Sequence, residues 1–132
     1  MEIPKILIVD DEDEARGMLG AYLMRNLECE VSETRDGRDA LERIDKEPLD
    51  LILLDIKMPG ISGLDVLERA KELHPDTGVI IISGYDSPQV VKDAFQKGAS
   101  EYIPKPSSRE VVLDKVVEIL KKKNKYIPKR PS

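Results

Sequence analysis

Cysteine and long apolar runs are scarce in this chain. Cys29 is the one cysteine, which excludes an internal disulfide framework and a zinc site built on cysteines. The longest uninterrupted aliphatic runs are Leu51–Leu54 and Val79–Ile82, with Ile6–Val9 of equal length, far short of the roughly 20 apolar residues that cross a bilayer. We therefore expect no membrane-spanning segment and no membrane partner.

An excess of positive charge is missing as well. The chain has 21 lysines and arginines against 26 aspartates and glutamates, for a net charge of −5, whereas a nucleic-acid footprint needs net or clustered positive charge. Residues 1–8 hold a short apolar stretch that runs into acids, without the layout of a signal peptide. We expect a soluble, cytoplasmic protein that does not itself bind nucleic acid.

The apolar residues that are present suffice for one folded domain. Of the 132 residues, 40% are hydrophobic, which suits a single core. Near-continuous apolar runs predict strands buried on both faces, as in parallel sheets, at residues 5–9, 51–54 and 79–82. Alternating apolar and polar residues at 28–33 predict a half-exposed edge strand, and 102–103 is a fifth, weaker strand.

Between these strands, apolar residues recur at three- and four-residue steps, which predicts amphipathic helices. The stripes run from Ala15 to Leu27, Ala40 to Ile44, Leu64 to Leu73, Val90 to Phe95 and Val112 to Leu120. Pro88 and Gly98 suit the start and the end of the fourth helix. Strict alternation of strand and helix predicts an α/β fold, with a five-stranded parallel sheet and helices on both faces.

Polar residues follow four of the predicted strands. Asp10 and Asp11 follow the first, Asp55 the third and Ser83 the fourth, and Lys105 comes after the fifth. Because open parallel sheets bind ligands at the carboxyl ends of their strands, we expect these side chains to meet in one pocket. A lone aspartate at such a place is usually a turn or helix-capping residue, which does not explain the whole set.

The charges in this pocket predict its chemistry. Carboxylates about 4 Å apart repel by several kcal/mol at an effective dielectric constant near 20, so the pocket must take up protons or bind a cation. Carboxylate oxygens without histidine or cysteine favour Mg²⁺, or Mn²⁺ in its place, over zinc. Lys105 and Ser83 would surround a phosphoryl group, and an aspartate can be the nucleophile that accepts it.

These residues stand in motifs that resemble those of bacterial response-regulator receiver domains, the phosphorylated modules of two-component signalling. The motifs are Ile6–Asp11, Leu54–Gly60 with Gly63, Ile82–Gly84, and Gly98–Ala99 followed by Tyr102 and Lys105–Pro106. The resemblance covers roughly residues 5–120, and the body is similar to receivers of NtrC-type regulators. It implies a flavodoxin-like (βα)5 fold with the strand order 2-1-3-4-5.

The resemblance assigns the chemistry residue by residue. Asp55 resembles the phosphoacceptor. Asp10 and Asp11 resemble the acidic pair that binds the metal ion, with Asp11 as the more direct ligand. Asp55 itself and the backbone carbonyl of Lys57 would complete the protein ligands of the metal.

Three further positions resemble the parts of the family's switch. Lys105 resembles the lysine that pairs with the phosphate, and Lys105–Pro106 the family's cis peptide. Ser83 resembles the hydroxyl residue that turns toward the phosphate, and Tyr102 the aromatic residue that moves inward with it. Many receivers have threonine where Ser83 stands. Serine lacks the methyl group of threonine, so the switch would be held less rigidly.

In function, the resemblance implies a signalling switch and not an enzyme of multiple turnover. A sensor histidine kinase would supply the phosphoryl group in a Mg²⁺-dependent transfer that the domain itself catalyses, and slow autodephosphorylation would follow. Activation would reshape the surface of the fourth helix, fifth strand and fifth helix. That surface would form a homodimer or control an output domain or effector protein, with transcription regulation as the expected output.

Two other functions are compatible with parts of the sequence. A phosphohydrolase of the haloacid-dehalogenase type carries an aspartyl nucleophile in a DxDx[TV] motif, but Asp11–Ala15 lacks the final residue and the chain is short for a capped enzyme. A degenerate receiver would bind a partner without phosphorylation, which the intact acids and lysine argue against. The glycine motifs of nucleotide-binding proteins do not occur in the sequence.

The end of the chain changes in character. We assign residues 1–121 to the receiver, and residues 122–132, which are basic and contain Pro128 and Pro131, to a C-terminal tail. Prolines end a helix and favour an extended chain. The tail is either a solvated end or the stub of a linker to an output domain.

Overall fold

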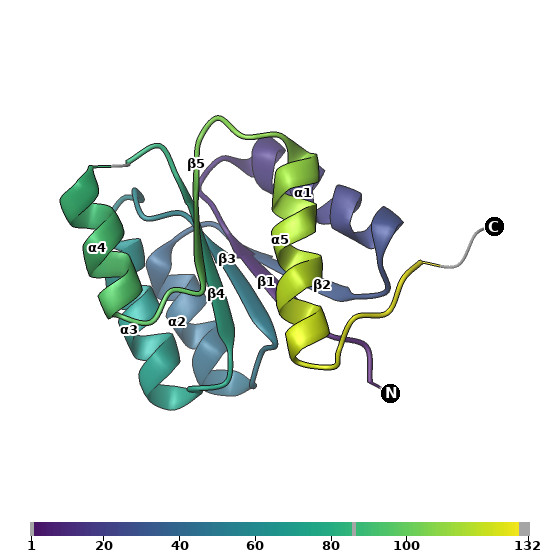
Figure 1. The fold of residues 1–132 in the computed structure, drawn as a ribbon. Helices are drawn as coiled ribbons and strands as arrows, with labels where there is room; N and C mark the ends of the chain where they lie inside the picture. Colours follow the sequence, from purple (N-terminus) through teal and green to yellow (C-terminus); the bar gives the residue numbers. More distant parts are fainter. Residues whose placement is uncertain (1, 86, 130–132) are drawn as a thin grey trace.

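The computed structural model describes residues 2–85 and 87–129 (Figure 1). It contains one sheet with the strand order β2-β1-β3-β4-β5, and every neighbouring pair of strands is parallel. The predicted α/β fold and strand order are confirmed. The strands are β1 Lys5–Val9, β2 Glu30–Thr34, β3 Leu51–Leu54, β4 Gly78–Ser83 and β5 Glu101–Pro104.

A helix follows each strand, and the helices lie on both faces of the sheet. In Figure 1, α1 and α5 cover one face, and α2, α3 and α4 cover the other. Pro88 begins α4, and Gly98, with a φ of 106°, follows its end, as the sequence predicts. The helices are α1 Asp13–Asn26, α2 Gly37–Lys46, α3 Gly63–Leu73, α4 Pro88–Gln96 and α5 Arg109–Lys122.

The hydrophobic core consists of two layers separated by the sheet. Successive side chains of a strand point to opposite faces, so Leu7 and Val9 pack under α2, α3 and α4, while Ile6 and Ile8 pack under α1 and α5. β3 is buried along its whole length because it lies in the middle of the sheet. β2 is an edge strand and is mostly exposed or half-buried, which confirms the interpretation of its alternating pattern.

The tail folds back onto the domain where α1 ends and β2 begins. Lys125 forms an ion pair of 2.5 Å with Asp50, and Tyr126 packs against the core layer under α1 and α5. The backbone N–H of Glu28 donates to the carbonyl of Ile127. That contact explains why β2 begins at Glu30 and not at residue 28: residues 27 and 28 bond the tail instead of the sheet.

The structure describes the C-terminal part of the chain only in part. The boundary between receiver and tail at residue 121 stays a prediction, and α5 itself ends at Lys122. Arg130 and Pro131, which belong to the predicted tail, lie outside the described residues. Within the described part of the chain, no helix combines the length and the apolarity needed to cross a membrane.

The single cysteine is expected to react slowly. Burial raises the pKa of the Cys29 thiol from 9.0 to about 11, which lowers the thiolate population at pH 8 roughly a hundredfold; the greater nucleophilicity of a more basic thiolate offsets part of this. We expect Cys29 to react with an aromatic disulfide reagent about tenfold more slowly in the native chain than in urea. Equal rates in the two conditions would show that the thiol is not shielded.

Candidate functional site

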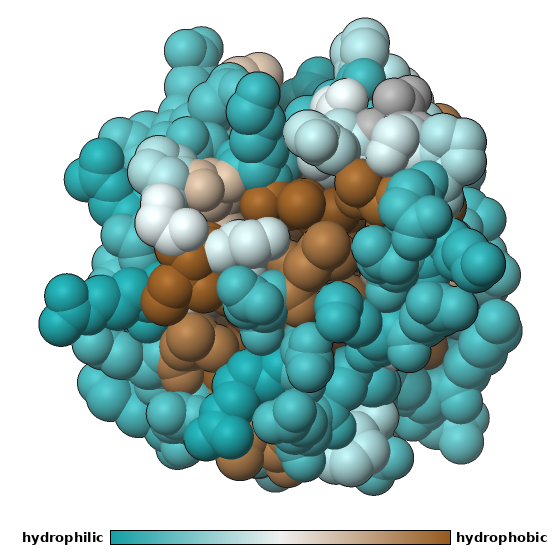
Figure 2. Space-filling view, turned by 90° about the vertical axis from the view of Figure 1, so that its left-hand side faces the viewer, coloured by the Kyte–Doolittle hydropathy of each residue, from teal (hydrophilic) through white to brown (hydrophobic). Residues whose placement is uncertain are grey.

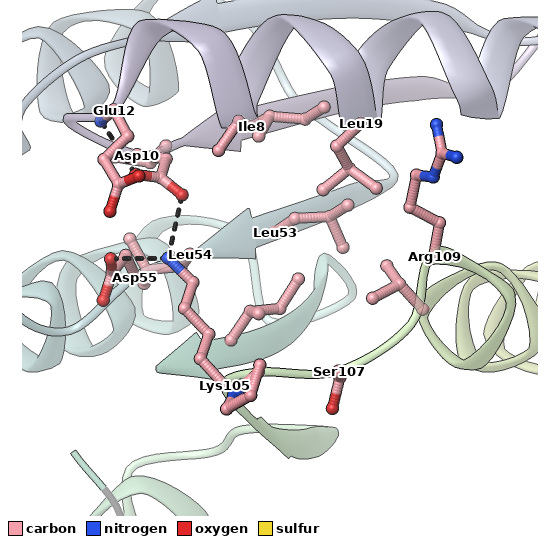
Figure 3. A pocket seen from close by; sticks show the side chains of 15 residues that line it. Ile8, Asp10, Glu12, Leu19, Leu53, Leu54, Asp55, Lys105, Ser107 and Arg109 are labelled. Atoms are coloured by element: carbon pink, nitrogen blue, oxygen red, sulfur yellow. Dashed lines mark hydrogen bonds and ion pairs between the residues drawn. The ribbon is translucent and has the colours of Figure 1, made fainter. Parts of the chain in front are cut away.

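The carboxyl ends of the strands bring together acids that are far apart in the chain. Asp10 follows β1 and Asp55 follows β3, two neighbouring strands. One carboxylate oxygen each from Asp10, Asp11 and Asp55 lies within 4.8 Å of the other two. Figure 3 shows Asp10 and Asp55 with the Lys105 side chain reaching both of them. The structure therefore places the predicted acids and the predicted lysine in one site.

Hydrogen bonds fix the orientation of the two buried carboxylates. Asp10 and Asp55 are each 9% exposed. The backbone N–H of Glu12 donates to Asp10 Oδ1 at 2.9 Å, and the N–H of Lys57 donates to Asp55 Oδ1 at 3.1 Å. The second oxygen of each carboxylate accepts from Lys105 Nζ, at 3.0 Å from Asp10 and 3.1 Å from Asp55.

Lys105 supplies the positive charge that allows two carboxylates to remain buried together. Its partial burial disfavours the ammonium form, but the hydrogen bonds to Asp10 and Asp55 outweigh burial and raise the pKa of Lys105 above its usual 10.5. Because the folded-state pKa is raised, the stabilisation by this ammonium is complete at neutral pH and is lost only in strongly alkaline solution. The Lys105–Pro106 peptide bond is cis, as the sequence resemblance implies.

The donor atoms of the site fit a hard divalent cation. Asp11 is exposed, and its carboxylate has no hydrogen-bond or ion-pair partner among residues 2–85 and 87–129. Carboxylate oxygens are the ligands that Mg²⁺ prefers, usually with several waters and phosphate oxygens completing its shell. These acids therefore have the chemistry and the spacing to hold Mg²⁺ through part of its coordination shell.

Two cavities meet at the ion pairs of Lys105. The first has a volume of about 650 Å³, is open to solvent, and is lined by Asp11, Lys57, Met58, Gly84 and Tyr85 together with Asp55 and Lys105. The second, of about 470 Å³, lies between α1 and α5, and its apolar wall includes Leu19, Leu53 and Val112 (Figure 3). The ion pairs of Lys105 thus lie between a cavity with several charged residues in its lining and a cavity with an apolar wall.

The two predicted switch residues both bond the loop that follows β4. Ser83 is fully buried at the end of β4, and its Oγ accepts from the backbone N–H of Tyr85 at 3.1 Å. The Tyr102 hydroxyl donates to the backbone carbonyl of the same Tyr85. Both side chains therefore contact one residue of the loop between β4 and α4, a connection that the sequence does not reveal.

Gly63 has a role that its place in the motif does not disclose. Its N–H donates to the carbonyl of Ile56 at 3.0 Å, so the start of α3 lies against the loop that follows Asp55. A Cβ at this position would stand 2.3 Å from the backbone oxygen of Asp55 and 2.6 Å from the Cα of Ile56. Only glycine allows this contact without moving the backbone of Asp55 and Ile56.

Comparisons with known proteins show the family of this chain. Residues 6–117 match the family described as "Response regulator receiver domain". The chain is 33% identical over 116 residues to the chemotaxis protein CheY of Bacillus subtilis. The aligned residues cover 88% of this chain and 97% of CheY. It superimposes with a TM-score of 0.88 on a CheY-like receiver from Methanospirillum hungatei, at 31% identity, covering 94% of this chain and 98% of that one.

Other relatives are much longer than this chain. It is 38% identical over 110 residues to the transcriptional regulatory protein SrrA of Staphylococcus aureus, covering 83% of this chain and 45% of SrrA. It is 33% identical over 116 residues to a cyclic di-GMP phosphodiesterase of Thermotoga maritima, covering 88% of this chain and 31% of that protein. The chain therefore spans less than half the length of these two relatives, whose names give different activities.

Proposed function

We propose a signalling function from one premise: the chain belongs to the family of response regulator receiver domains. Receiver domains are the phosphorylation-dependent switches of two-component signalling. In this chain, we infer that Asp55 accepts the phosphoryl group of a sensor histidine kinase. The observation that supports this assignment most strongly is the Lys105 ammonium, which pairs with Asp10 and Asp55 at the mouth of an open cavity that Asp11 also lines.

The transfer would proceed by attack of an Asp55 carboxylate oxygen on phosphorus. The P–N bond of the kinase phosphohistidine breaks as the new P–O bond forms, and the imidazole leaves as the neutral ring if its other nitrogen is protonated. Phosphoryl transfer depends mostly on position and charge neutralisation. The Lys57 N–H orients the carboxylate, and Lys105 can exchange a carboxylate oxygen for a phosphoryl oxygen without leaving the site.

The metal would be held by Asp10, Asp11, Asp55 and the backbone carbonyl of Lys57. Bound Mg²⁺, or Mn²⁺, supplies positive charge that offsets repulsion between the carboxylates and the phosphoryl oxygens. Hydrolysis would end the signal: water attacks phosphorus, the P–O bond to Asp55 breaks, and inorganic phosphate leaves. The domain is then a phosphoacceptor that catalyses its own modification and slow dephosphorylation.

The response would pass through Ser83 and Tyr102. A phosphoryl group on Asp55 would offer the Ser83 hydroxyl a charged acceptor, and a Ser83 side chain that turns toward it gives up the hydrogen bond from the Tyr85 N–H. A shift of Tyr85 would then break the hydrogen bond that the Tyr102 hydroxyl donates to the Tyr85 carbonyl. The two arrangements differ at β5 and at the start of α4. A switch of this kind is a shift between two populations, biased by the contacts that phosphate adds.

The surface formed by α4, β5 and α5 is the proposed output surface. Phe95 on α4 and Val111 on α5 are 46% and 43% exposed. Figure 2 views the molecule from the side of α4, with α5 turned away from the viewer, and shows apolar surface gathered in a band among hydrophilic residues. We propose that this surface forms a homodimer or controls an output domain or effector in the cytoplasm, with transcription regulation, as in the name of SrrA, as the output.

Phosphorylation by a small-molecule donor tests the proposed function directly. The chain is incubated with acetyl phosphate, with either Mg²⁺ or EDTA, and its intact mass is measured over time. We expect a mass increase of one phosphoryl group with Mg²⁺ and none with EDTA. A chain that stays unmodified, or that is modified equally without a divalent ion, would contradict the proposal, and rapid multiple turnover of phosphate esters would indicate a hydrolase instead.

A further inference from the structure

Arg16, in the first turns of α1, is bound by three different parts of the site's surroundings. Its Nη1 donates to the backbone carbonyl of Asp10 at 2.6 Å. Its Nη2 forms an ion pair with Asp13 at 2.8 Å, and its Nε forms one with Glu33 of β2 at 3.0 Å. The side chain is only 13% exposed. Each of the three guanidinium nitrogens therefore has a partner, which holds the planar group in one orientation.

These contacts complete the fixation of Asp10. The Asp10 N–H donates to the carbonyl of Thr34 at the end of β2, and its carboxylate is bound by Glu12 N–H and Lys105. The carbonyl of Asp10 is the remaining polar group, and Arg16 is its partner. Arg16 thus connects the loop that carries Asp10 and Asp11 to β2 and to the first turn of α1.

We propose that Arg16 is a positioning residue for the metal site: by holding the Asp10 carbonyl against α1 and β2, it fixes the loop that presents Asp10 and Asp11 to the cation. This inference rests on the proposed function, because it concerns the same Mg²⁺ site. Partners in the outer shell of a metal site orient the ligands and influence affinity although they do not touch the metal. Arg16 does so through the backbone of a ligand and not through its carboxylate.

The charge of Arg16 and its positioning role predict opposite changes in Mg²⁺ affinity when Arg16 is replaced. Arg16 is a permanent cation next to Asp10, so its charge repels a divalent cation, and its removal should strengthen Mg²⁺ binding. Loss of positioning should weaken Mg²⁺ binding, because Asp10 and Asp11 must then be ordered when the ion binds. The direction of the change in affinity therefore separates a positioning role from a purely electrostatic one.

The test compares Mg²⁺ dissociation constants, measured by isothermal titration calorimetry, for the parent chain and Arg16→Met. Methionine retains an unbranched apolar stem and removes every donor. The matched control is Arg25→Met, which removes the same charge from an exposed position of the same helix. We expect the dissociation constant to rise about tenfold in Arg16→Met, a size typical of outer-shell changes, and to stay unchanged in Arg25→Met.

A second readout distinguishes positioning from general loosening of the site. The rate constant for phosphorylation by acetyl phosphate at saturating Mg²⁺ should stay near that of the parent, because Asp55 and Lys105 are untouched. If Arg16→Met does not fold, Arg16→Lys replaces it. Lysine offers one nitrogen in place of the three with which Arg16 reaches the Asp10 carbonyl, Asp13 and Glu33, and we expect weaker Mg²⁺ binding there too.

The outcomes separate this inference from the proposed function. Equal or tighter Mg²⁺ binding by a folded Arg16 variant would overturn the positioning role and leave the proposed function intact. If the parent chain itself binds no Mg²⁺, the proposed function fails, and the positioning role fails with it. Weaker binding in the Arg16 variants, with the control unchanged, supports the positioning role.

Discussion

Asp55→Asn is expected to take up no phosphoryl group under conditions that phosphorylate the parent chain. The carboxamide keeps the shape of the side chain and an oxygen that can accept from Lys57 N–H, which is 3.1 Å from Asp55 Oδ1. It lacks the anionic oxygen that attacks phosphorus and forms the acyl phosphate. The measurement is the intact mass of both proteins after incubation with acetyl phosphate and Mg²⁺.

The control for this substitution is Asp65→Asn. Asp65 is an exposed acid in the first turn of α3, the helix that begins next to the Asp55 loop, so its replacement makes the same change in charge nearby. We expect Asp65→Asn to be phosphorylated at the rate of the parent. Undiminished uptake by Asp55→Asn, with its fold intact by circular dichroism, would show that another residue is the acceptor.

The second large effect is expected at Gly63, in stability and not in chemistry. Gly63→Ala would place a Cβ at 2.3 Å from the backbone oxygen of Asp55, and backbone atoms of a buried loop cannot give way as the end of a flexible side chain can. Overpacking of this kind lowers the free energy of unfolding by about 3 kcal/mol. Urea unfolding followed by circular dichroism at 222 nm, the usual helix signal, measures the change.

Gly17→Ala is the matched control for this prediction. Gly17 lies within α1, and a Cβ there would have no atom within 4 Å. Replacement of an unconstrained helical glycine by alanine raises stability by roughly 0.5–1 kcal/mol. The two substitutions are therefore expected to change the free energy of unfolding in opposite directions. A Gly63→Ala chain as stable as the parent would mean that the start of α3 does not lie against the loop that follows Asp55.

Much of the fold is predictable because it depends on local patterns. The apolar runs of β1, β3 and β4 have no polar face to expose, which requires a sheet covered on both sides. Strict alternation with helices then requires parallel strands, whose carboxyl ends meet at one edge. The approach of Asp10 to Asp55 follows from those steps, and the structure confirms it.

The features that the sequence does not reveal depend on contacts between distant segments. Arg16 binds Glu33 of another element, and an arginine in the first turn of a charged helix has no local mark of that contact. Glu28 bonds the tail and not β1, because residues near the chain's end compete for its N–H. The shared contact of Ser83 and Tyr102 with Tyr85 likewise depends on how the loop after β4 closes.

Mapping the phosphorylated residue is the most direct measurement of whether Asp55 is the acceptor. Trypsin releases the peptide of residues 47–57, which contains Asp55 and also Asp50 at the other end of β3. Tandem mass spectrometry of that peptide, after brief incubation with acetyl phosphate and Mg²⁺, should place the phosphoryl group on Asp55. A phosphoryl group found on Asp50, on His74 or on any other residue would contradict the assignment.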